Sequence, residues 1–228
     1  AGKDASGKVG DGVGILLQIS DDFFKKTLKK ENIKLPEYYG VGMFFLPRNK
    51  LLLNQHKKMF EKFVEQESCK FITWRKVPCN ESILGQKAKD CMPNIYQAFI
   101  ERPQNISSDV DFDKVLYVIR REFEKSCKET YVASLSSRTI VYKGMFLVSQ
   151  LRKFYLDLQD ENYKSAIAIV HSRFSTNTTP SWQRAHPNRF IAHNGEINTI
   201  RANVNKMLAR EESMHSEFLD ENSSKILP

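Results

Sequence analysis

The chain has 228 residues, 41% of them hydrophobic and 11% aromatic, which is enough for a substantial core, and its formal net charge is +8. No apolar run is long enough to span a bilayer, and the opening stretch AGKDASGKVGDG lacks the apolar core of a secretory signal. From these features we expect no membrane-spanning segment. They favour a soluble intracellular protein, cytoplasmic or alternatively in a plastid.

Hydrophobic periodicity predicts alternating strands and helices in the first half of the chain. Ser20 is expected to cap the first helix, with Asp21 and Asp22 in the first turn, where their charge suits the helix dipole. Strands are predicted at 13–20, 38–46, 69–78 and 94–102, and further helices at 49–68 and 109–126. The buried face of the helix at 49–68 is expected to carry Leu52, His56, Met59, Phe60, Phe63 and Val64. The inward residues of the helix at 109–126 are expected to be Phe112, Val115, Leu116, Ile119 and Phe123.

The second half of the chain predicts more strands than helices. Two β-rich runs within 130–147 are joined by SSR, which is typical of a hairpin. A helix near 148–157, strands at 165–174 and 189–195, and a helix from Glu196 to about Glu211 follow, the last with Ile197, Ile200, Val204, Met207 and Leu208 on one face. Because hairpin-like pairs replace a strict strand–helix alternation, we predict an α+β fold with mostly antiparallel sheets and helices packed outside.

The glycines of GDGVG indicate a turn in which Gly10, Gly12 and Gly14 provide positive φ angles or close backbone approach. Earlier, GKDASGK has the glycine and lysine spacing of a phosphate-binding loop. However, Val9 stands where that motif requires Ser or Thr, and a strand follows where the motif requires a helix. The sequence therefore does not favour a nucleotide site.

The four cysteines, Cys69, Cys79, Cys91 and Cys127, show no zinc-ligand spacing, so we expect reduced structural thiols and no metal. Much of the basic excess lies in KKTLKKENIK and HKKMFEKF, both of which are typical of helices with lysine on their outer face. Their aromatic residues fall on the apolar stripe and are not free to stack on bases. We therefore expect no nucleic-acid partner, although the charge leaves a basic nucleic-acid-binding module as an alternative.

Polar chemistry concentrates in IAIVHSRFSTNTTPSWQRAHPNRFIAHNGEIN, residues 167–198, which holds three of the five histidines. Arg173 follows a predicted strand and has the fork-shaped donor set that binds a carboxylate, although taken alone it better fits an ordinary surface salt bridge. Ser175, Thr176 and Asn177 suit either a polar ligand or a simple turn. These residues are candidates for substrate binding.

Asn194 and Gly195 follow the next predicted strand and precede a helix. A side-chain amide N–H beside a backbone N–H forms a donor pair for an oxyanion, and an Asn–Gly turn with a helix cap is the alternative. An oxyanion hole implies a nucleophile, but none of the four cysteines has an obvious base beside it in the sequence. The residues thus indicate a carboxylate clamp and an oxyanion hole without an attacking group.

The segments HSRFSTNT and PSWQRAHPNRFIAHNGEINTIRANVN closely resemble the glutaminase domain of glutamate synthases, within the class II, N-terminal-nucleophile amidotransferases. Four earlier segments fit in the same order: GDGVGILLQI, YYGVGMFFLP, QAFIERP and SLSSRTIVYKGM. The resemblance implies a four-layer αββα sandwich of the N-terminal-nucleophile hydrolase type. It also implies that residues 1–228 form a single domain that is truncated at both ends.

The resemblance also implies residue roles and partners. Arg173 matches the arginine that grips the glutamine α-carboxylate, and Asn194 and Gly195 match the catalytic oxyanion hole. The glutamine pocket is matched by Phe174, Ser175, Thr176 and Asn177. The complete protein is expected to hydrolyse L-glutamine and pass ammonia to a downstream synthase domain of the same chain, which reductively aminates 2-oxoglutarate. That domain is expected to carry FMN and an iron–sulfur cluster and to take electrons from ferredoxin or an electron-donor subunit, whereas these residues hold no cofactor.

In two respects we expect this chain to lack functional residues of the family that it resembles. The nucleophile of the family is a cysteine at the mature N-terminus, and Ala1 aligns one strand and one helix downstream of it, so we expect this stretch to be inactive by itself. The acidic residue that holds the substrate ammonium aligns beyond Pro228. A diverged amidotransferase-like domain without synthase activity is the alternative.

Overall fold

Seven strands and six α-helices make up the part of the chain that the computed structural model describes, residues 12–172, 180–189 and 200–214. The strands are β1 Val13–Gln18, β2 Tyr39–Leu46, β3 Lys70–Lys76, β4 Asn94–Glu101, β5 Tyr131–Ser136, β6 Thr139–Gly144 and β7 Ala168–His171. The helices are α1 Asp21–Lys29, α2 Lys50–Gln66, α3 Gln86–Asp90, α4 Asp109–Ser126, α5 Val148–Phe154 and α6 Arg201–Arg210. Short 3-10 turns lie at η1 Glu81–Ile83, η2 Leu156–Gln159 and η3 Glu211–Ser213.

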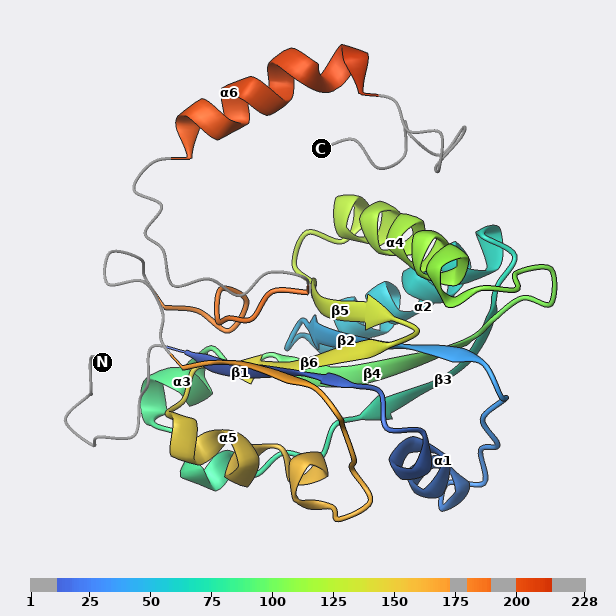
Figure 1. Ribbon diagram of the computed structural model, residues 1–228. Helices are drawn as coiled ribbons and strands as arrows, with labels where there is room; N and C mark the ends of the chain where they lie inside the picture. Colours follow the sequence, from blue (N-terminus) through green and yellow to red (C-terminus); the bar gives the residue numbers. More distant parts are fainter. Residues whose placement is uncertain (1–11, 173–179, 190–199, 215–228) are drawn as a thin grey trace.

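The strands form two antiparallel sheets, with the orders β6–β1–β7 and β3–β4–β2–β5. Figure 1 shows α2 and α4 on one side of the strands and α1, α3 and α5 on the other. The predicted α+β class with antiparallel sheets is therefore confirmed. None of the described helices combines the length and apolarity that a membrane crossing requires.

Strand β2 lies at the centre of the packing because both of its faces are buried. Alternate side chains of a strand point to opposite faces, so Phe44 packs with α2 and α4, whereas Met43 and Phe45 pack with residues of β1, β6, α1 and α5. Helix α4 lies close over this strand, since a Cβ at Gly40 would stand 2.7 Å from Leu116 Cδ1. The continuous apolar run of residues 38–46 is thus explained by burial on two sides.

The predicted hairpin is present, but its two strands belong to different sheets, β5 pairing with β2 and β6 with β1. Serine hydroxyls make part of the connection between them. The backbone N–H of Val141 donates to Ser134 Oγ at 3.0 Å, and that of Arg138 donates to Ser136 Oγ at 3.0 Å. The β5–β6 connection therefore links the two sheets.

Several predicted details are corrected by the packing. Helix α2 buries Leu53, Phe60 and Val64, whereas Leu52 is only half-buried and Met59 is exposed. Ser20 occupies the N-cap position of α1, but its hydroxyl donates to the carbonyl of Asn162 instead of capping the helix. The buried line of α2 is decided by where α4 and β2 lie, which local sequence does not contain.

The C-terminal elements also differ from expectation. Strand β7 is shorter than the predicted strand at 165–174, and η1 and α3 occupy a stretch with no predicted helix. The predicted strand at 189–195 lies outside the described residues except for Arg189. Helix α6 begins at Arg201, later than the predicted start at Glu196, which itself lies outside the described residues. Its apolar residues Ile200, Val204, Met207 and Leu208 are exposed in the structure.

Candidate functional site

The predicted site residues, Arg173, Phe174, Ser175, Thr176, Asn177, Asn194 and Gly195, all lie outside the described part of the chain. The structure does describe the chain on both sides of the first group: β7 ends at His171, two positions before Arg173, and the segment 180–189 follows Asn177. The same segment precedes Asn194. The described residues therefore flank the predicted site on both sides along the chain.

Three residues form a row across the sheet β6–β1–β7. Gly14 of β1 is paired with Lys143 of β6 on one side and with His171 of β7 on the other. Directly opposed residues of an antiparallel pair point to the same face. Lys143, Gly14 and His171 therefore share one face, at the end of the sheet from which the chain continues toward Arg173.

The segment 180–189 lies over this row, and Figure 1 shows it in orange alongside β1. The ring of His186 lies against that of His171, with centroids 4.9 Å apart. A Cβ at Gly14 would stand only 2.5 Å from the carbonyl oxygen of His186 and 3.0 Å from Pro187 Cδ. The close approach expected of Gly14 is confirmed, as is a positive φ at Gly12, of 140°. Gly10 lies outside the described residues.

Trp182 fixes the beginning of the segment to the core. Its indole is buried against Phe45, Phe146 and Phe154, and its Nε1–H donates to the carbonyl of Ala88 at 3.1 Å. A large aromatic side chain that is buried with its polar group satisfied is a strong anchor. The segment is therefore attached both to the core and to the sheet.

Lys143 of β6 is completely buried and also binds the segment 180–189. Its Nζ donates to Tyr131 Oη at 2.9 Å, to the carbonyl of Gln183 at 2.9 Å and to Asn188 Oδ1 at 3.0 Å. Three donors thus meet three neutral oxygens, an unusual setting because buried lysines are usually paired with a carboxylate. Burial, reinforced by the nearby charge of Arg189, lowers the pKa of Lys143 to about 7.

Arginines surround a single carboxylate beside this lysine. Glu124 of α4 accepts from Arg120 at 2.7 Å and from Arg189 at 2.6 Å, and Arg189 also donates to the carbonyl of Val132 at 2.7 Å. Burial and the neighbouring Arg189 lower the pKa of Arg120 to about 10. Arg121 lies a further 3.7 Å from the same carboxylate, so Glu124 is the common acceptor of this arginine cluster.

The buried ammonium predicts a specific pH dependence of stability. Because the pKa of Lys143 is lower in the folded protein than its ordinary value of 10.5, the unfolded chain binds more protons between pH 7 and 10. The unfolding free energy of the wild type relative to Lys143→Met should therefore rise with pH, by up to about 1.4 kcal/mol per pH unit. Urea unfolding at pH 7, 8 and 9 measures this, with the exposed Lys76→Met as control. If the unfolding free energies of the wild type and Lys143→Met changed in parallel with pH, the prediction would be wrong.

The cysteines are free thiols, as expected. Burial raises the pKa of Cys69 and of Cys79 to about 12 each, and that of Cys127 to about 11. Since the thiolate is the reactive form, these three side chains are poor nucleophiles at neutral pH. Within the described residues no three His, Cys, Asp or Glu side chains gather as metal ligands.

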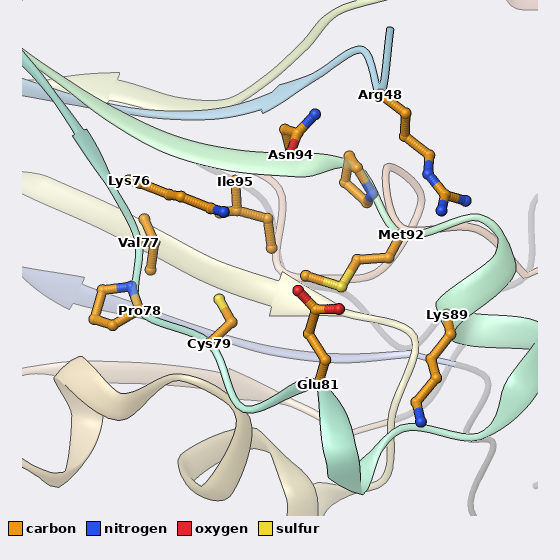
Figure 2. Close-up of a pocket in the computed structure, with 11 residues that line it drawn as sticks. Arg48, Lys76, Val77, Pro78, Cys79, Glu81, Lys89, Met92, Asn94 and Ile95 are labelled. Carbon is orange, nitrogen blue, oxygen red and sulfur yellow. The ribbon is translucent and has the colours of Figure 1, made fainter. Parts of the chain in front are cut away.

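A separate cavity of about 430 Å³ opens beside the end of β3 and the start of β4. Figure 2 shows Glu81 and Met92 directed toward its centre, between Lys76 on one side and Arg48 on the other. Its lining is Arg48, Lys76, Val77, Pro78, Cys79, Glu81, Lys89, Met92, Pro93, Asn94 and Ile95. Of the described residues, Lys143, Gly14 and His171 are not among those that line this cavity.

Sequence reasoning did not single out Lys143, Trp182 or Arg189, although they stand within the segments that carried the resemblance. One signal was available, since a lysine inside the otherwise apolar strand TIVYKG is unusual. What the sequence could not show is that the strand is covered on that face, which makes the lysine a buried donor.

Comparison with known proteins agrees with the resemblance. The family model described as "Glutamine amidotransferases class-II" matches residues 1–228. The chain is 45% identical over 231 residues to the glutamate synthase [NADPH] large chain of Bacillus subtilis (strain 168), with 100% of this chain and 15% of the relative covered. It is 41% identical over 237 residues to the ferredoxin-dependent glutamate synthase 1, chloroplastic/mitochondrial, of Arabidopsis thaliana, covering 100% of this chain and 14% of the relative.

A third relative, the glutamate synthase [NADPH] large chain of Azospirillum brasilense, is 44% identical over 226 residues, covering 94% of this chain and 15% of the relative. The chain thus spans about one seventh of the length of these relatives. The family match covers the whole chain, including the described residues 180–189 that lie against the row Lys143–Gly14–His171. The chain belongs to the class II glutamine amidotransferase family.

Proposed function

We propose that this chain is the glutaminase part of a glutamate synthase. It would bind L-glutamine and contribute to hydrolysis of the side-chain amide, which yields glutamate and ammonia. The observation that carries the proposal is the match of the whole chain to one family, together with 41–45% identity to glutamate synthases of two kinds.

The proposed architecture is one domain of the N-terminal-nucleophile hydrolase type, a four-layer αββα sandwich. Two antiparallel sheets with helices on both sides support it. In such a fold, reactive groups at strand ends are held by a rigid scaffold. Lys143, Gly14 and His171 are that scaffold here, since they hold the chain on both sides of Arg173 to Asn177.

The proposed roles are those that the resemblance to the family implies. Arg173 pairs with the α-carboxylate of glutamine, and the pocket around the substrate is lined by Phe174, Ser175, Thr176 and Asn177. A thiolate attacks the amide carbon, and the oxyanion that forms accepts hydrogen bonds from Asn194 and from the backbone N–H of Gly195. Ammonia leaves after protonation, and water then hydrolyses the thioester to release glutamate.

The attacking thiolate is assigned to none of the four cysteines of this chain. Three of them have raised pKa values because of burial. We propose instead that the complete protein supplies the N-terminal cysteine of the family and that activity requires it. FMN and an iron–sulfur cluster belong to a downstream synthase domain, and relatives named for NADPH and for ferredoxin both match this chain.

Replacing Arg173 with alanine in the complete protein should raise KM for glutamine by roughly 10- to 100-fold, because the substrate carboxylate loses a charged hydrogen-bond partner. Steady-state assays of glutamate and ammonia release measure the change. The matched control is Arg152→Ala, which removes an exposed arginine of α5 and should leave KM unaltered. Wild-type kinetics in the Arg173 variant would remove it from this role. A complete lack of glutamine hydrolysis in the wild type would favour a diverged, non-synthase domain.

A further inference from the structure

We propose that Lys143 is a positioning residue of the glutamine site, acting through the segment 180–189. The inference rests on the proposed function and goes beyond it, because Lys143 is not one of the substrate-binding or oxyanion residues. It assigns to a buried lysine the task of holding the chain that connects the two halves of that site.

The contacts of Lys143 bridge otherwise separate parts of the chain. Its Nζ reaches the start of β5 through Tyr131 and reaches the covering segment at two points, the carbonyl of Gln183 and the side chain of Asn188. Its own carbonyl accepts from Tyr155 Oη at 2.7 Å, which ties this part of β6 to the region after α5. The Lys143 side chain thus fixes two points of the segment 180–189 to β6. Tyr155 in turn holds β6 through the carbonyl of Lys143.

Between those two points the segment lies directly on the neighbouring strands. His186 and Pro187 approach β1 where Gly14 has no side chain, and the ring of His186 lies against His171 of β7. The contacts of the segment therefore extend across β6, β1 and β7 in turn. Movement of the segment away from Lys143 would disturb its contact with the end of β7, from which the chain leads to Arg173.

Connectivity makes this segment important for both halves of the proposed site. The chain enters the segment after Phe174 to Asn177 and leaves it before Asn194 and Gly195. Displacements of about 1 Å can reduce the rate of an enzyme by about a hundredfold, because reacting groups must be held in the productive geometry. A residue that holds the connection thus affects substrate capture and turnover together.

The first test uses a matched pair at Asn188 in the complete protein. Asn188→Asp keeps an oxygen that accepts from Lys143, whereas Asn188→Leu has nearly the same size and removes it. We expect Asn188→Leu to lower kcat/KM for glutamine by roughly tenfold, as for loss of one hydrogen bond to a charged group, and Asn188→Asp to stay close to wild type. Equal kinetics of the two variants would overturn the inference.

The second test removes the ammonium itself. Lys143→Met should lower kcat/KM by roughly 10- to 100-fold, since two oxygens of the segment lose their donor. It should also accelerate amide hydrogen exchange in residues 182–189 relative to Leu116→Ala, a core variant in α4 that destabilises the fold without touching the segment. If Lys143→Met does not fold, the Asn188 pair decides the question.

The outcomes separate this inference from the proposed function. Glutamine hydrolysis by the wild type with unchanged kinetics and exchange in Lys143→Met would overturn the positioning role alone. Reduced kcat/KM in both Lys143→Met and Leu116→Ala, without a local change in exchange, would also overturn it, because the effect would then be general destabilisation. No hydrolysis by the wild type would overturn the proposed function and this inference with it.

Discussion

Replacing Asp157 with alanine should lower the free energy of unfolding by about 3–5 kcal/mol, because it leaves a buried guanidinium without its counter-charge. Arg75 of β3 donates to both carboxylate oxygens of Asp157, at 2.7 and 2.8 Å, and the two side chains are only 6% and 2% exposed. Tyr142 Oη donates to the same carboxylate at 3.1 Å. Burial opposes the charge of Arg75, but the hydrogen bonds and charge of Asp157 outweigh it and keep the pKa of Arg75 above its ordinary value.

Urea unfolding of the single and double variants measures this prediction. Arg75→Met combined with Asp157→Leu removes both charges and should lose much less stability than Asp157→Ala, because a buried pair replaced by apolar groups is often nearly neutral. The exposed pair of Lys70 and Glu101 provides the contrast, since Glu101→Ala should cost less than about 1 kcal/mol. Similar losses for Asp157→Ala and Glu101→Ala would show that the buried pair has no special role.

The pair matters for the fold because it joins segments far apart in the sequence. Asp157 lies in η2, Arg75 in β3, and Gln97 of β4 accepts from Arg75 at 2.7 Å and donates to Tyr142 Oη at 3.0 Å. These hydrogen bonds connect the four-stranded sheet with β6 of the other sheet. Loss of the Asp157 carboxylate should therefore destabilise the whole domain. The variant should still unfold in a single transition, with its midpoint at a lower urea concentration.

Asn194→Ala should reduce kcat for glutamine hydrolysis by roughly a hundredfold to a thousandfold, the usual effect of removing one oxyanion donor. The negative charge exists only in the tetrahedral intermediate and its transition state, so KM should change little. Assays of glutamate release by the complete protein measure both constants. Asn105→Ala, at an exposed position of a loop, is the control and should behave as wild type.

The different effects on kcat and KM also distinguish the role of Asn194 from that of Arg173. A variant at Arg173 weakens binding of the ground state and acts mainly on KM, whereas Asn194 acts on the chemical step. An Asn194→Ala protein that turns over glutamine at the wild-type rate would exclude it from the oxyanion hole. The unfolding midpoint of the variant should match the wild type, which distinguishes a lost donor from a damaged fold.

The best predictions from sequence concerned elements whose signals are local. Helix α4 extends from Asp109 to Ser126 as predicted, and Ser108 caps it by accepting from the backbone N–H of Asp111 at 3.1 Å. Its apolar spacing also indicated four of the buried residues, Phe112, Leu116, Ile119 and Phe123, whereas the predicted Val115 is only half-buried and the buried Val118 was not predicted. A long periodic pattern with a capping residue contains everything needed to place such a helix.

Predictions that depended on neighbouring elements were weaker. The pattern of α2 did not distinguish Leu52 from Leu53, and Ser20 uses its hydroxyl for a distant contact. The roles of Arg173, Asn194 and Gly195 stay predictions, since these residues lie outside the described part of the chain. Spacing along a chain indicates which residues have suitable chemistry, but not which of them face one another.

The amino-acid sequence by itself determined the antiparallel α+β class and the family, because strand and helix periodicity are local and the motifs of residues 167–205 are specific in combination. Only the tertiary structure decided that Lys143 is a buried donor, that Gly14 admits the backbone of His186, and that β5 and β6 separate into two sheets. The physical reason is that burial and hydrogen-bond partners depend on segments distant in sequence, and a lysine in a strand looks the same whether its face is covered or open to water.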